Sequence, residues 1–366
     1  MVPSAIGGDR EKRTGVILAK SIPAKRFNII TGEPVALALR KCPNLFLARP
    51  DFQLYERNSK AFMDICRKYT PVVEKYSIDE CFMDISGMGK IFTDPAEAAK
   101  ELKDEIWNTL GFTVNVGISS KKILAKMASD FEKPGKVHTL YPEEIESKLW
   151  PLPVRALFTV GKAAEERLKR INISNIGELA KADIRLIQAT IGEKAGRQIH
   201  EYANGIDDSP VLSEADEAKG FSCSTTLSED VVASEEAYKI LLSLTDTATS
   251  RMRAEGVKAY CVSVTVRSSD FKDKSHQRAL NEPTDITTQI YNLSKNLFDE
   301  LWDGRTPLRL LGVSLTDLTK EGEIQQTLFR DREKERQREL DKAMDNIRSK
   351  YGSDKVSWGS TLHTEE

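Results

Sequence analysis

Two adjacent acidic residues, Asp79 and Glu80, place the strongest constraint on how this chain can fold. Residues 71–73 before them, and residues 81–85 after them, where Cys81, Met83 and Ile85 alternate with Phe82 and Asp84, are typical of short strands. Neighbouring side chains of a straight strand point to opposite faces, so the two carboxylates converge only where the chain turns between two strands. The sequence therefore predicts a hairpin that has Asp79 and Glu80 at its turn.

Two converging carboxylates repel each other, and a divalent cation is the usual means of offsetting that repulsion. Oxygen ligands of this kind suit Mg²⁺, which often takes one or two carboxylates together with substrate phosphates. An acidic turn that is simply solvated would have the same sequence. The pair alone leaves both interpretations open.

The composition is that of a globular protein with several domains. A chain of 366 residues is too long for a single ordinary core and indicates about two to four domains. No apolar run approaches the length of a membrane span, and the N-terminus carries no signal-peptide pattern. We therefore expect a cytoplasmic protein that has no membrane contact. The five cysteines are never spaced C-x-x-C and the four histidines are scattered, so no zinc or thiol site is expected.

The net charge of −2 hides a basic region at the start of the chain. Residues 1–50 hold nine Lys or Arg residues and only three acids. A local basic lobe can bind phosphate even when the whole chain is close to neutral. A solvated basic face is the alternative.

The first part of the chain alternates strands with helices, and helices are expected at residues 35–41, 52–69 and 95–110. Residues 113–118 are typical of a buried strand, after which Ser119 and Ser120 are expected to cap a helix. Lys122 and Lys126 lie four residues apart on that helix and therefore share a face. Lysines near a helix start favour anion binding, although a solvated lysine face fits the pattern equally well.

Residues 157–177 match a helix-hairpin-helix pattern, with Gly161 and Lys162 at the turn. In that motif a glycine turn offers backbone N–H groups to a DNA phosphate without reading the bases. A packing corner between two helices is the alternative. The acidic, turn-rich residues 205–218 are typical of a linker between domains.

From residue 219 the expected elements follow the order β-α-β-β-α-β, which gives a four-stranded sheet with helices on one face. In the second of these strands, valines alternate with Ser263, Thr265 and Arg267, so the other face of the sheet is polar. Such a face suits contact with a phosphate backbone, but it can also be merely solvated.

The tail contains an apolar cluster in a charged segment, with Gln325, Leu328 and Phe329. Anchors of this kind usually enter a pocket on a partner, the alternative being packing on their own domain. The following residues, 330–351, predict a charged helix whose apolar stripe is formed by Leu340, Met344, Ile347 and Tyr351.

Nearly the whole chain, from Pro3 to Phe329, resembles the Y-family translesion DNA polymerases of the bacterial polymerase IV type. The Val160-Gly161 hairpin and the final apolar cluster, which is similar to the family's sliding-clamp pentapeptide, contribute to the resemblance. The resemblance rests mainly on the order and spacing of three motifs. These are Ser77-Ile78-Asp79-Glu80 with Phe82 and Asp84, Gly117-Ile118-Ser119-Ser120, and Leu124-Ala125-Lys126-Met127-Ala128-Ser129 with Lys133-Pro134.

The resemblance implies an α/β multidomain fold. Its expected parts are a palm with a mixed sheet (1–8 and 51–140), small fingers (9–50), a helical thumb with the helix-hairpin-helix (141–206), a linker (207–217), a β-α-β-β-α-β little-finger domain (218–319), and a tail with the clamp-binding motif and an amphipathic helix (320–366).

The resemblance also implies template-directed nucleotide addition that bypasses DNA damage, with two Mg²⁺ ions as cofactors. Asp79 would be the ligand shared by both ions, and Glu80 a ligand on the primer side. Lys126 and Lys25 would contact the nucleoside triphosphate. The expected partners of this monomer are primer–template DNA, deoxynucleoside triphosphates and the bacterial sliding clamp. The DNA contacts would come from Gly161, Lys162 and the polar sheet residues.

The sequence departs from the family pattern in two places. The family begins with a strand that carries Asp-x-Asp and a helix with the aromatic residue that screens out ribonucleotides, together about thirty residues. Residues 3–8 match the segment after these elements, so an impaired active site is expected. In addition, Ile22 and Lys25 stand where many members have Tyr and Arg.

Two other functions are compatible with these features. One is a non-catalytic remnant that binds DNA and the sliding clamp. The other is a helix-hairpin-helix repair nuclease, against which the lack of further clustered acids argues.

Overall fold

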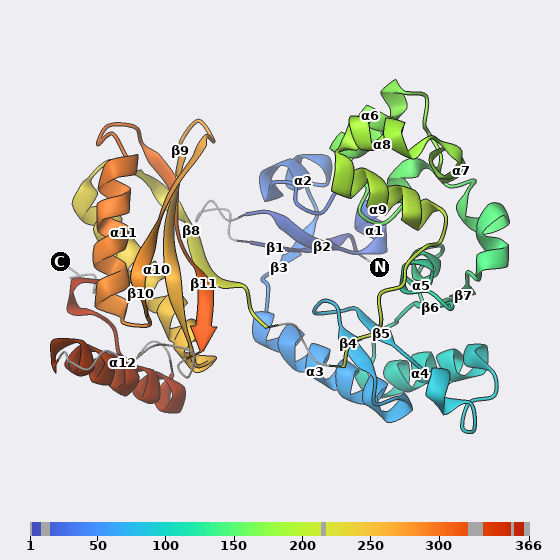
Figure 1. The fold of residues 1–366 in the computed structure, drawn as a ribbon, viewed down its shortest axis with the longest axis horizontal. Helices are drawn as coiled ribbons and strands as arrows, with labels where there is room; N and C mark the ends of the chain where they lie inside the picture. The colour runs from blue at the N-terminus through green and yellow to red at the C-terminus, as the bar shows by residue number, and fades with distance from the viewer. Residues whose placement is uncertain (1, 9–14, 214–216, 321–331, 353–354, 362–366) are drawn as a thin grey trace. The chain divides into compact units, whose positions relative to one another are not determined.

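The computed structural model describes residues 2–8, 15–213, 217–320, 332–352 and 355–361 (Figure 1). The chain divides into two compact units. One unit comprises Met1–Pro50 and Glu217–Glu366, and the other comprises Asp51–Asp216.

The first fifty residues form a small sheet with two short helices. The strands are β1 (Ser4–Gly7), β2 (Ile17–Lys20) and β3 (Phe46–Ala48), in the order β2-β1-β3, and the helices are α1 (Ile22–Lys25) and α2 (Val35–Lys41). Strand β1 runs antiparallel to β2 and parallel to β3, and Ala5 packs into the same core as Ile17. Both edges of β1 hydrogen-bond to strands of residues 17–48, so residues 1–8, expected to belong to the palm, share a sheet with the segment expected to form the fingers.

The second unit begins with the segment expected to form the palm. Its elements are α3 (Phe52–Tyr69), β4 (Val73–Lys75), β5 (Cys81–Met83), the 3₁₀ turn Ser86–Met88, α4 (Pro95–Leu110), β6 (Val116–Ile118), α5 (Lys122–Ser129) and β7 (Val137–Thr139). Strands β4 and β5 pair antiparallel, and β6 and β7 pair parallel, as two separate two-stranded sheets. This segment thus contains one antiparallel and one parallel strand pair, and the long helices α3 and α4 have the predicted bounds.

Short helices follow in the same unit. They are the single turns Pro142–Glu144, Ile145–Leu149 and Val154–Ala156, and the helices α6 (Lys162–Arg170), α7 (Ile176–Lys181), α8 (Ile184–Ile191) and α9 (Glu193–Ala203). Leu124 and Met127 of α5 share one buried core with side chains of α6 to α9. Helix α5 is therefore packed into the helical subdomain as well as against its own strand.

The C-terminal part of the other unit has the predicted β-α-β-β-α-β order. Its elements are β8 (Gly220–Val231), α10 (Ser234–Ala254), β9 (Val257–Ser268), β10 (Asp273–Thr284), α11 (Thr287–Leu301) and β11 (Leu308–Lys320). The sheet order is β10-β9-β11-β8, with antiparallel neighbours throughout. Alternate residues of β9 and β11, such as Val264 and Val313, are buried against α10 and α11, which lie along the sheet in Figure 1. The opposite face of the sheet is not covered by these helices.

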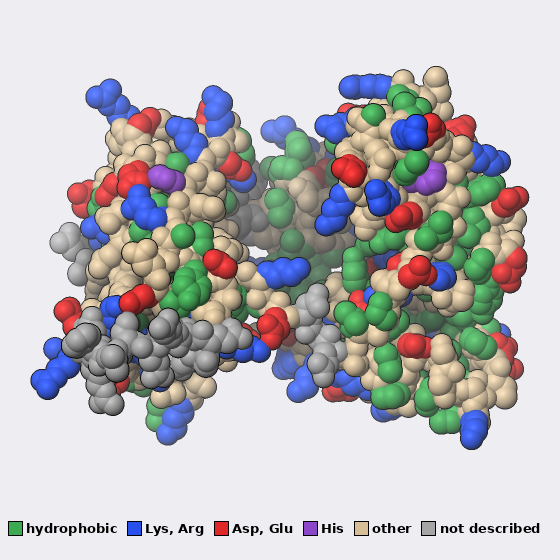
Figure 2. Space-filling model, viewed as in Figure 1, with side chains coloured by type: hydrophobic (Ala, Val, Ile, Leu, Met, Phe, Trp, Pro, Cys, Tyr) green, Lys and Arg blue, Asp and Glu red, His purple; other side chains and the backbone are tan. Residues whose placement is uncertain are grey.

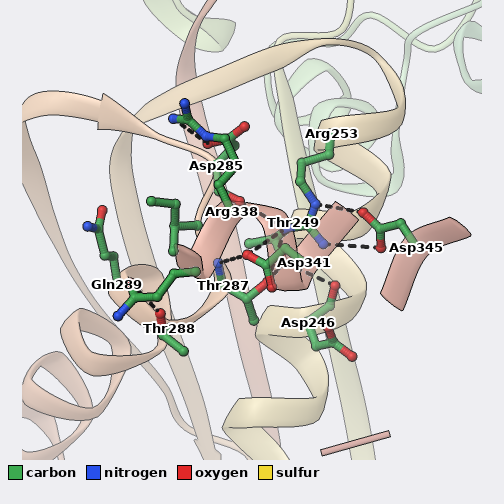
Figure 3. A network of polar contacts seen from close by, with 12 residues as sticks. Asp246, Thr249, Arg253, Asp285, Thr287, Thr288, Gln289, Arg338, Asp341 and Asp345 are labelled. Carbon is green, nitrogen blue, oxygen red and sulfur yellow. Dashed lines mark hydrogen bonds and ion pairs between the residues drawn. The ribbon is translucent and has the colours of Figure 1, made fainter. Parts of the chain in front are cut away.

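The last helix, α12 (Arg332–Tyr351), docks on α10 and α11 through charged residues (Figure 3). Asp341 is buried and accepts a hydrogen bond from the Thr287 backbone N–H at 2.8 Å. Arg253 lies 3.4 Å from the Asp341 carboxylate and binds Asp345 at 2.7 Å.

The stripe predicted for α12 is therefore not the face that is buried. Met344 is buried, but Leu340, Ile347 and Tyr351 are exposed. The reason is that α10 presents Arg253 and the buried Asp246, and α11 presents the backbone N–H of Thr287, and these groups need charged or polar partners when buried. Burial raises the pKa of the Asp341 carboxyl, although the Thr287 N–H and the Arg253 charge oppose this effect.

Candidate active site

The predicted acidic hairpin is present. Strands β4 and β5 are joined by a turn in which the backbone N–H groups of Tyr76 and Ser77 both donate to the Glu80 carbonyl, each at 3.0 Å. The Asp79 carboxylate is exposed and accepts a hydrogen bond from the Ser77 hydroxyl at 2.8 Å. The turn thus brings both acids to one end of the hairpin, but their carboxylates engage different partners.

The partner of Glu80 is Lys126 on helix α5. The Lys126 ammonium lies 2.6 Å from the Glu80 carboxylate and 3.2 Å from that of Asp130. Burial by itself lowers the pKa of Lys126, but the two carboxylates outweigh that effect and raise it, so the side chain is charged. The structure therefore brings together Glu80 and Lys126, which the sequence assigned to one active site.

A second lysine–glutamate pair lies beside the first. Lys122, one turn before Lys126 on α5, binds both carboxylate oxygens of Glu74 on β4, at 2.7 and 2.8 Å. Its ammonium also lies 4.9 Å from the centre of the Phe82 ring. The prediction that the two lysines share a face is confirmed, and within the structure each of them is neutralised by a carboxylate of the chain itself.

The expected serine cap of α5 was wrong. Lys121 occupies the N-cap position of the helix, but its side chain makes no capping hydrogen bond. The Ser119 hydroxyl donates instead to the Leu140 carbonyl at 2.6 Å. The capping acceptor is Asp207, which accepts from the Ile123 N–H at 2.9 Å. Sequence reasoning missed both Glu74 and Asp207, because neither lies in a motif and Asp207 is distant from α5 along the chain.

A cavity of about 870 Å³ opens beside the hairpin. It is lined by Asp79 and Glu80, by β5 and β6, and by apolar residues of α3 and α4. Within the described part of the chain, β5 pairs only with β4, and β6 only with β7. The cavity is therefore bounded by two strand edges whose backbone groups are not paired in a sheet.

Two thiols lie at this cavity. The sulfur atoms of Cys66 on α3 and Cys81 on β5 are 3.7 Å apart. Their hydrogen bond, together with burial, raises the pKa of the Cys66 thiol, and the same hydrogen bond lowers the pKa of Cys81. The two cysteines are free thiols.

The hairpin supplies part of the ligand set that a hard cation such as Mg²⁺ needs. Asp79 and Glu80 offer carboxylate oxygens, which Mg²⁺ prefers, and Mg²⁺ commonly takes its remaining ligands from substrate phosphates and water. Among the described residues, however, no three His, Cys, Asp or Glu side chains are arranged to hold a metal ion. The pair therefore fits an ion whose other ligands come from bound substrate, and Glu80 must release Lys126 to serve it.

The other predicted contact residues lie on accessible surfaces. Lys25 is exposed at the end of α1. Gly161 is the residue that caps α6, with open space around its Cα, and Lys162 follows it with an exposed side chain. Both positions leave the backbone N–H groups at the start of α6 accessible.

The polar face of the four-stranded sheet is as predicted. Ser263, Thr265 and Arg267 alternate with buried valines along β9. Arg267 is bound to Asp273 of the neighbouring strand at 2.5 Å. On the side of each unit drawn in Figure 2, basic and acidic side chains of the described residues are interspersed.

The tail residues Gln325, Leu328 and Phe329 lie outside the described residues. Among the helices that the structure describes, none is long and apolar enough to cross a membrane.

Three family models match the chain. The model of the impB/mucB/samB family matches residues 1–130, and that of its C-terminal domain matches residues 218–328. The model described as the DNA polymerase-iota thumb domain matches residues 155–207, which contain α6 to α9.

Curated relatives extend the similarity to the full length of the chain. The chain is 44% identical to DNA polymerase IV of Clostridium acetobutylicum over 100% of its own length and 91% of the relative's. It is 37% identical to DNA polymerase IV of Clostridium kluyveri over 98% of the chain and 92% of the relative. Among solved structures, a Y-family DNA polymerase chimera of Dbh and Dpo4 superposes with a TM-score of 0.77 at 21% identity, covering 87% of this chain and 93% of that one. Together with the acidic hairpin, these similarities mean that the chain belongs to the polymerase IV group of the Y-family DNA-directed DNA polymerases.

Proposed function

We propose that this chain adds deoxynucleotides to a primer opposite a template, in the translesion manner, by two-metal nucleotidyl transfer. The observation that carries the proposal is the pairing of Glu80 with Lys126 at the turn of an acidic hairpin. A metal ligand and a phosphate-binding cation are thereby held together before any substrate is bound. The substrates are primer–template DNA and deoxynucleoside triphosphates.

In this proposal Asp79 and Glu80 hold the metal ions through their carboxylate oxygens. When bound, these ions lower the pKa of the primer 3′-hydroxyl and stabilise charge at the α-phosphate. Glu80 would exchange its ion pair with Lys126 for a bound metal ion, and the freed ammonium of Lys126 would bind the triphosphate as a point charge. Lys25 supplies a second positive charge to the triphosphate.

DNA is held mainly through its phosphates. The accessible N–H groups at the start of α6, with Gly161 and Lys162, accept one backbone segment. The hydroxyl-rich sheet face around Ser263, Thr265 and Arg267 contacts another. Such contacts position the duplex without reading its sequence.

A protein that only binds DNA and the clamp is the second candidate. It is favoured by the small number of carboxylates at the hairpin, since among the described residues no three metal-ligating side chains are arranged to hold an ion. Primer extension by the unmodified chain separates the two candidates.

The test is primer extension in Mg²⁺ with the full chain and with the variants Asp79→Ala and Glu80→Ala. We expect weak extension by the unmodified chain, loss of that extension in both variants, and DNA affinity within about twofold of the original, because only metal positioning is removed. Asp104→Asn, which changes an exposed acid on α4, is the control and should extend primers as far as the unmodified chain does. Equal extension by all four proteins would refute the catalytic assignment, and an unmodified chain that binds DNA but never extends a primer would favour the second candidate.

The sliding clamp is proposed as a partner on the resemblance of residues 325–329 to the clamp-binding pentapeptide. Burying two side chains such as Leu328 and Phe329 contributes roughly 1.5–3 kcal/mol each, enough for modest affinity. Replacing both with Ala should eliminate capture by the clamp in a pull-down without lowering the melting temperature. A large drop in melting temperature without any clamp binding by the original chain would assign the two residues to the core instead.

A further inference from the structure

The residues that follow helix α9 are held tightly against the second unit. Four contacts join residues 207–212 to the start of α5 and to β4, all within that unit. Asp207 binds the Ile123 N–H, Asp208 binds Lys121 at 2.7 Å, the Pro210 carbonyl accepts from Lys122 at 3.0 Å, and the Leu212 N–H donates to Glu74 at 2.8 Å. We call the contacts of Asp207, Pro210 and Leu212 the latch, and we leave the Asp208–Lys121 pair out of it because that pair is at the surface. The predicted linker is therefore anchored over its first half.

Glu74 is the centre of the latch, because its carboxylate joins three segments. It accepts two hydrogen bonds from Lys122 of α5 and one from the Leu212 N–H, while itself lying on β4. The Glu74 and Lys122 side chains are only 18% and 15% exposed, so solvent screens their ion pair less than a surface pair. The Lys122 ammonium donates to both Glu74 oxygens and to the Pro210 carbonyl. These three hydrogen bonds use all three N–H donors of the ammonium. Lys122 is therefore committed to structure and has no donor left for an external phosphate.

Asp207 completes the start of α5. One of its oxygens accepts from the Ile123 N–H at 2.9 Å, and the other accepts from the N–H and hydroxyl of Ser209, at 3.1 and 2.6 Å. A carboxylate at this end is favoured by the helix dipole, and it supplies the cap that Lys121 does not provide. The first turn of α5 thus depends on a residue that lies beyond α9 in the chain.

The two lysine–glutamate pairs of α5 consequently have different roles. Lys122 and Lys126 lie one turn apart and bind two acids of the same hairpin, Glu74 on β4 and Glu80 at the turn. The first pair is fixed by the latch. The second has to open during the proposed reaction, and Lys126 then needs a rigid helix behind it in order to meet the triphosphate.

We propose that Glu74 and Asp207 are positioning residues that orient Lys126 toward the metal ligand and the nucleotide. Through them, the segment leaving α9 fixes the first turn of α5. The part of this inference that concerns the nucleotide rests on the proposed function, whereas the mechanical part does not.

The mechanical part is tested by hydrogen exchange and mass spectrometry on the full chain. In the original chain, the peptides covering residues 205–213 and 121–129 should both be protected. Asp207→Ala should speed exchange about fivefold in both peptides, because it removes a helix cap, and Glu74→Ala should do the same. Asp207→Asn keeps an acceptor at the same place and should restore protection.

Asp208→Ala is the matched control. It removes the neighbouring acid of the same segment, whose side chain is 85% exposed and whose ion pair with Lys121 is at the surface. It should leave exchange in both peptides unchanged. An unprotected 205–213 peptide in the original chain, or equal effects of Asp207→Ala and Asp208→Ala on residues 121–129, would overturn the inference.

The nucleotide part is tested by measuring the apparent Kd of the correct deoxynucleoside triphosphate on a dideoxy-terminated primer–template. Glu74→Ala and Asp207→Ala should raise this Kd about fivefold, because Lys126 keeps its charge but loses part of its fixed position, while Asp207→Asn and Asp208→Ala should leave it within twofold. An unchanged Kd alongside faster exchange in 121–129 would overturn the positioning role. If the original chain bound no nucleotide, the proposed function would fail, and the exchange data alone would then decide whether the latch holds α5.

Discussion

At the scale of single residues, the close packing of β6 against α5 depends on Gly117. A Cβ added at Gly117 would lie 1.9 Å from the Ala125 carbonyl oxygen and 2.5 Å from the Ser129 nitrogen, and these backbone atoms cannot move aside as a side chain can. The glycine in the Gly117-Ile118-Ser119-Ser120 motif thus lets the helix that carries Lys126 lie directly on the strand.

Gly117→Ala should destabilise the protein by about 1–3 kcal/mol, because β6 and α5 must separate to admit the methyl group. Chemical denaturation followed by circular dichroism measures this loss. Gly161→Ala is the control, since nothing lies within 4 Å of the added Cβ. It should cost no more than about 0.5 kcal/mol, the difference between Gly and Ala at a helix N-cap, and should weaken DNA binding. Equal losses of stability in the two variants would contradict the packing argument.

At the scale of elements, α12 shows that a charged face can be the docking face of a helix. Its buried contacts are ion pairs and a hydrogen bond to the start of α11, with Asp341 as the most buried acid among them (Figure 3). Removing one partner of such a group leaves the other charge buried without compensation, which costs more than the pair itself contributes.

Asp341→Ala should therefore destabilise the β-α-β-β-α-β domain by about 3–5 kcal/mol, since Arg253 loses one of its two carboxylates and the Thr287 N–H loses its acceptor. Leu340→Ala, the adjacent residue on the exposed stripe, should cost less than about 0.5 kcal/mol. Urea denaturation of both variants gives the comparison. If Leu340→Ala were the more damaging change, the apolar stripe and not the charged face would hold the helix.

At the scale of the whole molecule, DNA affinity should depend on salt and hardly on sequence. The proposed contacts at Gly161, Lys162 and the sheet face are to phosphates, and neutralised phosphates release counterions. The charge of the whole chain is only −2, so the response comes from local basic groups and not from a general attraction.

A fluorescence titration across a range of salt concentrations should show affinity falling linearly on a double-logarithmic plot, with the same slope for unrelated duplexes. Lys162→Ala should reduce that slope by about one, since it removes one phosphate contact. A flat salt response would contradict phosphate binding, and slopes that differ between sequences would indicate base contacts.

The sequence by itself determined the local elements. Alternating apolar residues around the Asp79-Glu80 pair predicted the hairpin, and helical spacing that stops before Pro71 predicted the bounds of α3. The β-α-β-β-α-β order of the C-terminal domain was also readable, because each of its elements is long and strongly periodic. Such signals act within a few residues of the chain, so they do not depend on where the elements finally pack.

Only the tertiary structure decided which elements meet. The sheet membership of β1, the cap of α5 by Asp207, the bond between Glu74 and Leu212, and the charged docking face of α12 all join residues that are distant along the chain. The spacing of residues along the chain does not indicate such a distant partner. A carboxylate that caps a helix and a carboxylate that is solvated have the same appearance in the sequence. The polar partner that each buried group requires is fixed only when the fold brings the two together.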